Sequence, residues 1–181
     1  DGVLGTSHFI PDNIMLYAEL DGAPGNKFGA TAGRITLLSA VFMRPTKITA
    51  MGFNFTTVSA GGNARCALYQ CLSDGSVGNL IVDSGNISTA ATGFVFATLA
   101  TPVILPAGDY FQANMADNTA VRAYGARSAD NVIIVGRQGT NEANGRGELR
   151  RQYDVTYGAF PTTLASSIGS VSLSSLEVFY Q

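Results

Sequence analysis

The sequence has no tryptophan, a single histidine, two cysteines and few charged residues. The shortages of charge, histidine and cysteine each argue against a class of function. Charged residues make up 13% of the chain, whereas globular proteins average roughly 25%. The formal net charge of −2 gives no general attraction to nucleic acid or to an anionic membrane. No apolar run reaches the roughly 18 residues of a membrane helix, and the first residues show no basic-then-apolar signal pattern. We therefore expect neither nucleic-acid binding nor membrane insertion.

The shortage of histidine and cysteine argues against catalysis and metal binding. His8 lies in an irregular N-terminal stretch, which is a poor place to hold a base within hydrogen-bond reach of a nucleophile. One histidine and two cysteines do not supply the three or four ligands of a zinc site, so we expect no metal and no cofactor. A glycan hydrolase remains an alternative, because a glycosidase needs only two carboxylates. The candidate carboxylates, all in or beside turns of the C-terminal half, are Asp117, Asp130, Glu142, Glu148 and Asp154.

Cys66 and Cys71 share one predicted strand, "ARCALYQC". Five residues of extended chain separate their Cα atoms by about 16 Å, whereas a disulfide tolerates roughly 4.4 to 6.8 Å. We expect two free thiols and folding in a reducing cytoplasm, with pairing to another chain left open. The parity of Cys66 with Leu68 places Cys66 on the core face.

The chain is rich in short apolar strands separated by turns, and helix signals are almost absent. Turn clusters such as "SAGGN" and "SDGSVGN" recur at intervals of about 10 residues, a pattern typical of an antiparallel sandwich or barrel rather than of βαβ units. We expect an all-β, jelly-roll-like antiparallel β-sandwich over residues 14–181, after an irregular arm or connector at residues 1–13. Because the sequence starts at Asp1 and not at methionine, we expect it to be part of a longer chain. The expected strands are 14–20, 34–43, 47–58, 64–72, 79–85, 93–99, a hairpin within 101–116, 119–125, 131–136, 148–157 and 172–181.

One predicted strand, residues 47–58, contains a break in its alternation. Met51, Phe53 and Phe55 share one face, but Ile48 has the opposite parity. A bulge or bend near Thr49 and Ala50 would bring all four apolar side chains to the same face.

The stretch "TPVILPAGDYFQANMA", residues 101–116, predicts a chain reversal. Pro106 and Gly108 occupy positions that tight turns favour. After the turn, Phe111, Ala113 and Met115 alternate with polar residues, which is the period of a strand with one buried face. We therefore expect a β-hairpin.

Several strand and turn signatures follow one another along residues 48–115. A strand of alternating apolar residues leads to a Gly-rich turn; then come an Arg-initiated strand, Arg65 to Tyr69, and a turn from Asp74 to Leu80. A strand pair follows from Ser84 to Gly93, and the "LPAGDY" segment closes the series from Leu105 to Tyr110. In this order they resemble a β-sandwich domain of tail-fibre and other virion surface proteins of tailed bacteriophages. The resemblance carries no catalytic signature.

This resemblance implies a non-enzymatic bacteriophage virion structural protein, made in the host cytoplasm and displayed on the virion surface, on the tail or the capsid. We expect a tail-fibre or receptor-binding domain for host adhesion, with a capsid decoration or head-fibre protein that binds the shell as the alternative. The expected partners are copies of the same chain in a homo-oligomer, most simply a trimer, other virion proteins, and a host surface glycan or protein. A surface with so few charges packs against copies of itself with little charge desolvation.

Cations gather in residues 122–151, which hold six of the 11 Lys and Arg residues against three acids, a balance of 6 − 3 = +3. Within this span "GRQGTNEANGRG", residues 136–147, is a long polar loop, and such loops are functional or mobile in compact domains. The simpler interpretation is an exposed loop that is disordered or ordered only by a neighbouring subunit. The sharper one is a contact surface for a glycan or protein, in which tyrosine rings, among them Tyr157, lie beside Arg and amide donors. The candidate binding residues are Tyr124, Arg127, Arg137, Arg146 and Tyr153.

Overall fold

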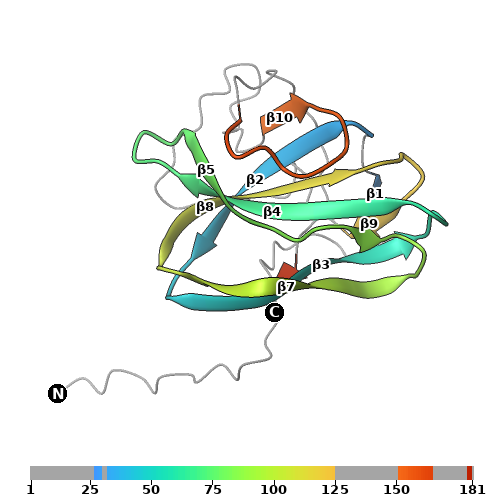
Figure 1. The fold of residues 1–181 in the computed structure, drawn as a ribbon, viewed down its shortest axis with the longest axis horizontal. Helices are drawn as coiled ribbons and strands as arrows, with labels where there is room; N and C mark the ends of the chain where they lie inside the picture. Colours follow the sequence, from blue (N-terminus) through green and yellow to red (C-terminus); the bar gives the residue numbers. More distant parts are fainter. Residues whose placement is uncertain (1–26, 30–31, 125–150, 165–178, 181) are drawn as a thin grey trace.

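The computed structural model describes residues 27–29, 32–124, 151–164 and 179–180 of the chain. In these ranges there is no helix, and the strands form two antiparallel sheets (Figure 1). The predicted all-β, antiparallel sandwich is therefore confirmed, while its jelly-roll connectivity stays a prediction. The expected arm at residues 1–13 and the expected strands at 14–20 and 131–136 lie outside the described residues.

The two sheets divide the strands unequally. The five-stranded sheet has the order β1-β9-β3-β11, with β7 on the opposite edge of β3. Its strands are β1 (Lys27–Gly29), β3 (Thr46–Thr57), β7 (Gly93–Leu105), β9 (Arg122–Tyr124) and β11 (Phe179–Tyr180). The six-stranded sheet has the order β10-β2-β8-β4-β5, and β6 also pairs with β4. Its strands are β2 (Arg34–Phe42), β4 (Asn63–Cys71), β5 (Val77–Asp83), β6 (Ile87–Ser88), β8 (Gly108–Ala116) and β10 (Arg151–Asp154).

The inner core lies between the two sheets. Along β4 it takes the alternate residues Ala64, Cys66 and Leu68, because successive side chains of a strand point to opposite faces. Its buried side chains include those predicted to share a face of β3, together with Cys66 and Leu68 from β4. Both cysteines lie on β4 and are free thiols, as expected. The β3 members of this core are Ile48, Met51, Phe53 and Phe55.

The register is irregular at the place in β3 where a bulge was predicted, but the extra residues belong to the partner strand, β7. The β3–β7 register shifts between Ile48, which pairs with Val103, and Ala50, which pairs with Thr98. Thr49 alone therefore faces the four residues 99–102 of β7. Leu99, at the start of this bulge, is buried in the inner core.

The predicted hairpin at residues 101–116 is wrong, because its two strands belong to different sheets. β7 pairs with β3, whereas β8 pairs with β2 and β4. The "PAG" turn thus carries the chain from one sheet across to the other. Tyr110 holds this crossing, since its hydroxyl donates a hydrogen bond to the Pro106 carbonyl at 2.9 Å and its ring packs edge-on against Phe42. The alternation correctly placed Phe111, Ala113 and Met115 on one buried face, but it could not assign the strand to a sheet, and Asn114 and Ala116 are buried as well.

A second core lies on the outer face of the six-stranded sheet. Residues 155–164, which follow β10 and which we call the cover segment, lie across this face in front of β2 and β8 (Figure 1). The Tyr69 hydroxyl donates to the Pro161 carbonyl at 2.7 Å, and the Leu80 amide donates to the Thr162 carbonyl at 2.9 Å. The six-stranded sheet is therefore packed on both faces. The buried members of this outer core are Ile35, Leu37, Ala67, Tyr69, Phe111, Ala113, Met115, Tyr153 and Phe160.

Candidate binding surface on the six-stranded sheet

The structure separates the candidate binding residues that the sequence grouped together. Tyr124 ends β9 in the five-stranded sheet, whereas Tyr153 lies in β10 of the six-stranded sheet. Arg127, Arg137 and Arg146 lie outside the described residues.

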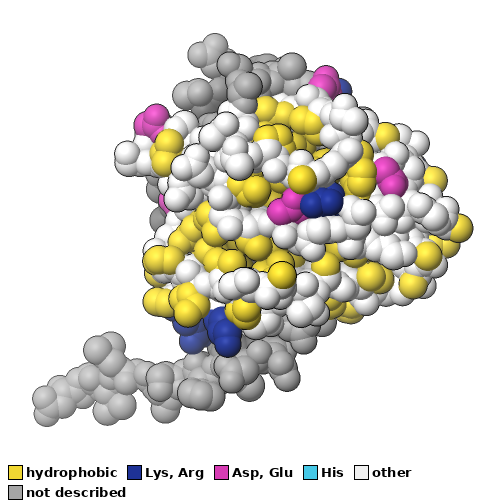
Figure 2. Space-filling model, in the orientation of Figure 1, with side chains coloured by type: hydrophobic (Ala, Val, Ile, Leu, Met, Phe, Trp, Pro, Cys, Tyr) yellow, Lys and Arg dark blue, Asp and Glu magenta, His cyan; other side chains and the backbone are white. Residues whose placement is uncertain are grey.

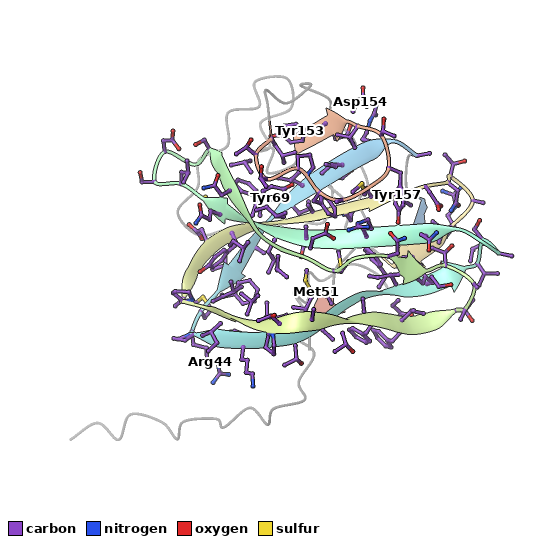
Figure 3. All side chains as sticks on the ribbon, in the orientation of Figure 1. Arg44, Met51, Tyr69, Tyr153, Asp154 and Tyr157 are labelled. Atoms are coloured by element: carbon purple, nitrogen blue, oxygen red, sulfur yellow. The ribbon has the colours of Figure 1, made fainter. Side chains whose placement is uncertain are left out.

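Tyr153 belongs to the outer core and does not offer its ring to a ligand. Its side chain is buried, and β10 pairs with β2 so that Tyr153 lies opposite Ile35. Tyr157, four residues later on the cover segment, is only partly buried. Figure 3 shows the two residues apart, with Tyr157 lying toward β4. Of Tyr153 and Tyr157, Tyr157 is therefore the one at a surface.

The polar residues next to Tyr157 centre on a charge pair that the sequence did not single out as a site. Arg65 projects outward from β4, and Asp83 ends β5. Arg65 Nη2 and Nε donate to the two carboxylate oxygens of Asp83 at 2.7 and 3.3 Å, and both side chains are 15% exposed. A bidentate pair of this kind fixes the orientation of both groups.

The Asp83 carboxylate also binds two backbone amides. The Gly85 amide donates to Oδ1 at 2.9 Å, and the Phe160 amide donates to Oδ2 at 3.0 Å. Asp83 thus accepts four hydrogen bonds, from β4, from the turn after β5 and from the cover segment. This one side chain ties the cover segment to the sheet beneath it.

Asn86 extends this network to the surface. Its Oδ1 accepts a hydrogen bond from Arg65 Nη1 at 2.9 Å and another from the Tyr157 hydroxyl at 3.1 Å. Burial raises the pKa of the Tyr157 phenol to about 12, although the Arg65 charge acts in the opposite direction. Tyr157 is therefore a neutral donor at physiological pH. We call Arg65, Asn86 and Tyr157 the amide–tyrosine surface.

The environment of the amide–tyrosine surface is nearly uncharged. Figure 2 shows one acidic and one basic group in contact near the middle of the visible face, surrounded by hydrophobic and neutral polar atoms. The charge of Arg65 is balanced by Asp83 within the network. A ring, an amide and a partly covered guanidinium held in fixed geometry can bind a neutral, hydroxyl-rich ligand.

The candidate carboxylates that the structure describes support turns and strand ends. Asp117 accepts hydrogen bonds from the Asn63 amide at 2.8 Å and from Asn118 Nδ2 at 2.6 Å. Burial alone would raise the pKa of Asp117, but these hydrogen bonds lower it below its ordinary value. Asp154 pairs with Arg34 at 2.8 Å. Asp130, Glu142 and Glu148 lie outside the described residues.

Neither a metal cluster nor a known relative guides the assignment further. Within the described ranges, no three His, Cys, Asp or Glu side chains come close enough together to hold a metal ion. The same part of the chain has no helix of the length and apolarity that a membrane crossing requires. No protein-family model matches the sequence, and neither does any curated protein.

Proposed function

We propose that this chain is a non-enzymatic structural protein of a tailed-bacteriophage virion, and that it acts as a tail-fibre or receptor-binding domain. In this proposal the amide–tyrosine surface binds a neutral glycan of the host cell surface. The observation that carries it is the hydrogen-bonded network of Arg65, Asp83 and Asn86, which holds an exposed amide beside a tyrosine without a net charge. The resemblance of residues 48–115 to virion surface domains supports the proposed place of the chain in a bacteriophage virion.

The chemistry of the surface favours a sugar over an acidic polymer. A tyrosine ring packs against the apolar face of a pyranose while its hydroxyl binds water or sugar. Asn86 is exposed, and its Oδ1 already accepts two hydrogen bonds. Its Nδ2 makes no hydrogen bond within the described residues and is free to donate to a ligand hydroxyl. An anionic ligand would gain little, because Asp83 neutralises the nearby guanidinium.

The use of the described carboxylates supports a binding role rather than hydrolysis. Asp83, Asp117 and Asp154 each accept hydrogen bonds that hold the fold together. A glycosidase needs one carboxyl as an acid and another as a nucleophile or base, facing one sugar. The other predicted binding residues, Arg127, Arg137 and Arg146, lie in residues 125–150. We keep them in the proposal as further receptor-contacting residues.

Binding of purified chain to an array of bacterial surface glycans tests the proposal. Asn86→Ala and Tyr157→Ala should each weaken binding about 30-fold, because a well-placed anchor contributes roughly 2 kcal/mol. Asn79→Ala, an exposed asparagine on β5 of the same sheet, is the matched control and should bind like wild type. Asn86→Ala should also leave the melting temperature nearly unchanged. Wild-type binding by both surface variants would remove this site from the proposal.

A capsid decoration or head-fibre protein is the second candidate. The strongly exposed hydrophobic side chains at one end of the sandwich favour contact with another protein. In that case, variants of the amide–tyrosine surface would not change host adsorption. Imaging of intact particles would then show the chain bound to the capsid shell. Release of reducing sugar from host polysaccharide would instead support the hydrolase alternative.

A further inference from the structure

One end of the sandwich exposes apolar and basic side chains together. Here the turn after β2 and the turn after β7 both cross from one sheet to the other. Met43 is 89% exposed and Ile104 is 71% exposed, the two highest values among the described large hydrophobic residues. Lys47 lies directly opposite Ile104 in the β3–β7 register, and Arg44 precedes it in the turn. We call Met43, Arg44, Lys47 and Ile104 the corner surface.

The two cations of the corner surface differ from Arg34 and Arg65, which both lie in ion pairs. Arg34 pairs with Asp154 at 2.8 Å and Arg65 pairs with Asp83 at 2.7 Å, but within the described residues neither Arg44 nor Lys47 forms an ion pair. Figure 2 shows basic groups next to hydrophobic side chains at the lower left of the molecule, and Figure 3 shows Arg44 pointing away from the sheets there. A partner that fits this surface must therefore combine apolar side chains with negative charge.

The sequence before β1 has this composition. Residues 1–26 contain Asp1, Asp12, Glu19 and Asp21 and no Lys or Arg, which gives a formal charge of −4. Two of these acids, Asp12 and Glu19, lie within the largely apolar stretch "FIPDNIMLYAEL", residues 9–20. Its acids and apolar side chains complement the corner surface in both respects.

Strand pairing places the start of β1 at the opposite end of the five-stranded sheet from the corner surface. β1 is antiparallel to β9, and β9 is antiparallel to β3, so β1 runs parallel to β3. Lys27 pairs with Tyr124 of β9, and the neighbouring Ala123 pairs with Phe55, so Lys27 lies near the end of β3, whereas Lys47 lies at its start.

We propose that the corner surface binds residues 9–21 of a second copy of this chain. Apolar side chains of the segment cover Met43 and Ile104, while Glu19 and Asp21 pair with Arg44 and Lys47. We assign the contact to two copies because Lys27, the first described residue after the segment, lies near Phe55, at the other end of β3 from Lys47. This proposal concerns self-association and does not depend on the amide–tyrosine surface or its ligand.

Zero-length carbodiimide coupling of a mixture of light and isotope-labelled full-length chains tests the contact directly. This reagent joins Lys47 Nζ to a carboxylate only where the two groups touch. We expect peptides that link Lys47 to Asp12, Glu19 or Asp21, with one light and one heavy partner. Peptides linked only within one isotope class would show docking within a single chain and overturn the proposal. Absence of any such peptide would overturn it too.

Charge reversal supplies the complementary test. The double variant Arg44→Glu, Lys47→Glu should weaken self-association about tenfold or more in sedimentation, because like charges then face each other. Mixing it with the double variant Glu19→Lys, Asp21→Lys should restore association. Arg122→Glu reverses another exposed cation, on β9, and should have no effect.

Three results would refute the corner contact: unchanged association in the first double variant, failure of the mixture to recover, or an equal loss in Arg122→Glu. Glycan binding by the same variants separates the two proposals. We expect the charge-reversed chains to bind glycan like wild type, since the amide–tyrosine surface is untouched.

Discussion

Replacing Asp83 with asparagine should show how much of the attachment of the cover segment depends on this carboxylate. The substitution keeps the shape of the side chain but converts one acceptor oxygen into an NH2 donor. Each Asp83 oxygen now accepts one hydrogen bond from Arg65 and one from a backbone amide. Whichever oxygen is replaced, the new NH2 group faces two hydrogen-bond donors, one from Arg65 and one backbone amide. The guanidinium of Arg65 also loses its counter-charge.

The expected cost follows from the burial of the pair. Hydrogen bonds to a charged group contribute roughly 1.5 to 3 kcal/mol each, and removing one partner of a buried pair costs about 3 to 5 kcal/mol. Since both side chains keep 15% exposure, water relieves part of this cost, and we expect a loss of about 2 to 4 kcal/mol in the free energy of unfolding. A domain with roughly 5 to 15 kcal/mol of stability remains folded after such a loss.

Asp154→Asn provides the matched control. Asp154 also pairs with an arginine, at 2.8 Å, but the side chains of that pair are 30% and 60% exposed. Exposed pairs contribute about 0 to 1 kcal/mol. Urea unfolding should therefore separate the two variants, and hydrogen exchange should show faster exchange at the Phe160 and Leu80 amides in Asp83→Asn alone. Equal costs for the two substitutions would refute the role assigned to Asp83.

Three further predictions concern the core and the thiols. Phe53→Ala should lower the free energy of unfolding by about 3 to 5 kcal/mol in chemical denaturation, because it empties the inner core. Gly52→Ala should destabilise by about 1 to 3 kcal/mol in the same assay, since a Cβ there would overlap the Val95 carbonyl oxygen. Burial raises the pKa of the Cys66 thiol from 9.0 to about 12, so native alkylation should label Cys71 alone. Because the unfolded chain ionises this thiol first, stability should fall as the pH rises from about 9 toward 12, and Cys66→Ala should reduce that fall.

The strands of the sandwich could be predicted from the sequence because their period is local. The expected strands at 34–43, 47–58 and 64–72 agree with β2, β3 and β4 to within one residue at each end. The broken parity of Ile48 also located the register shift. These features depend on the alternation of apolar and polar side chains over a few residues, and this alternation can be read from the sequence alone.

The partners of each strand could not be predicted in the same way. Phe111 alternates as a buried residue whether its strand joins one sheet or the other, so the hairpin interpretation failed although the buried face was correct. Tyr153 is buried because β10 pairs with β2, more than 100 residues earlier in the chain.

The network around Asp83 likewise joins three segments that no local pattern connects. A signal was available in β4, where "CALY" is apolar on both parities. Such a run is typical of a strand covered on both faces.

The bulge in β7 has a consequence for how copies of this domain pack when crowded. β7 is 13 residues long and uncharged, and within the described residues it pairs with β3 alone. A straight edge of this kind is a template on which strands of other molecules add and aggregate. Residues 99–102 interrupt it, and Pro102 has no amide to donate. The edge is thus divided into two short pieces, and we expect this division to hinder the addition of a strand from a neighbouring copy.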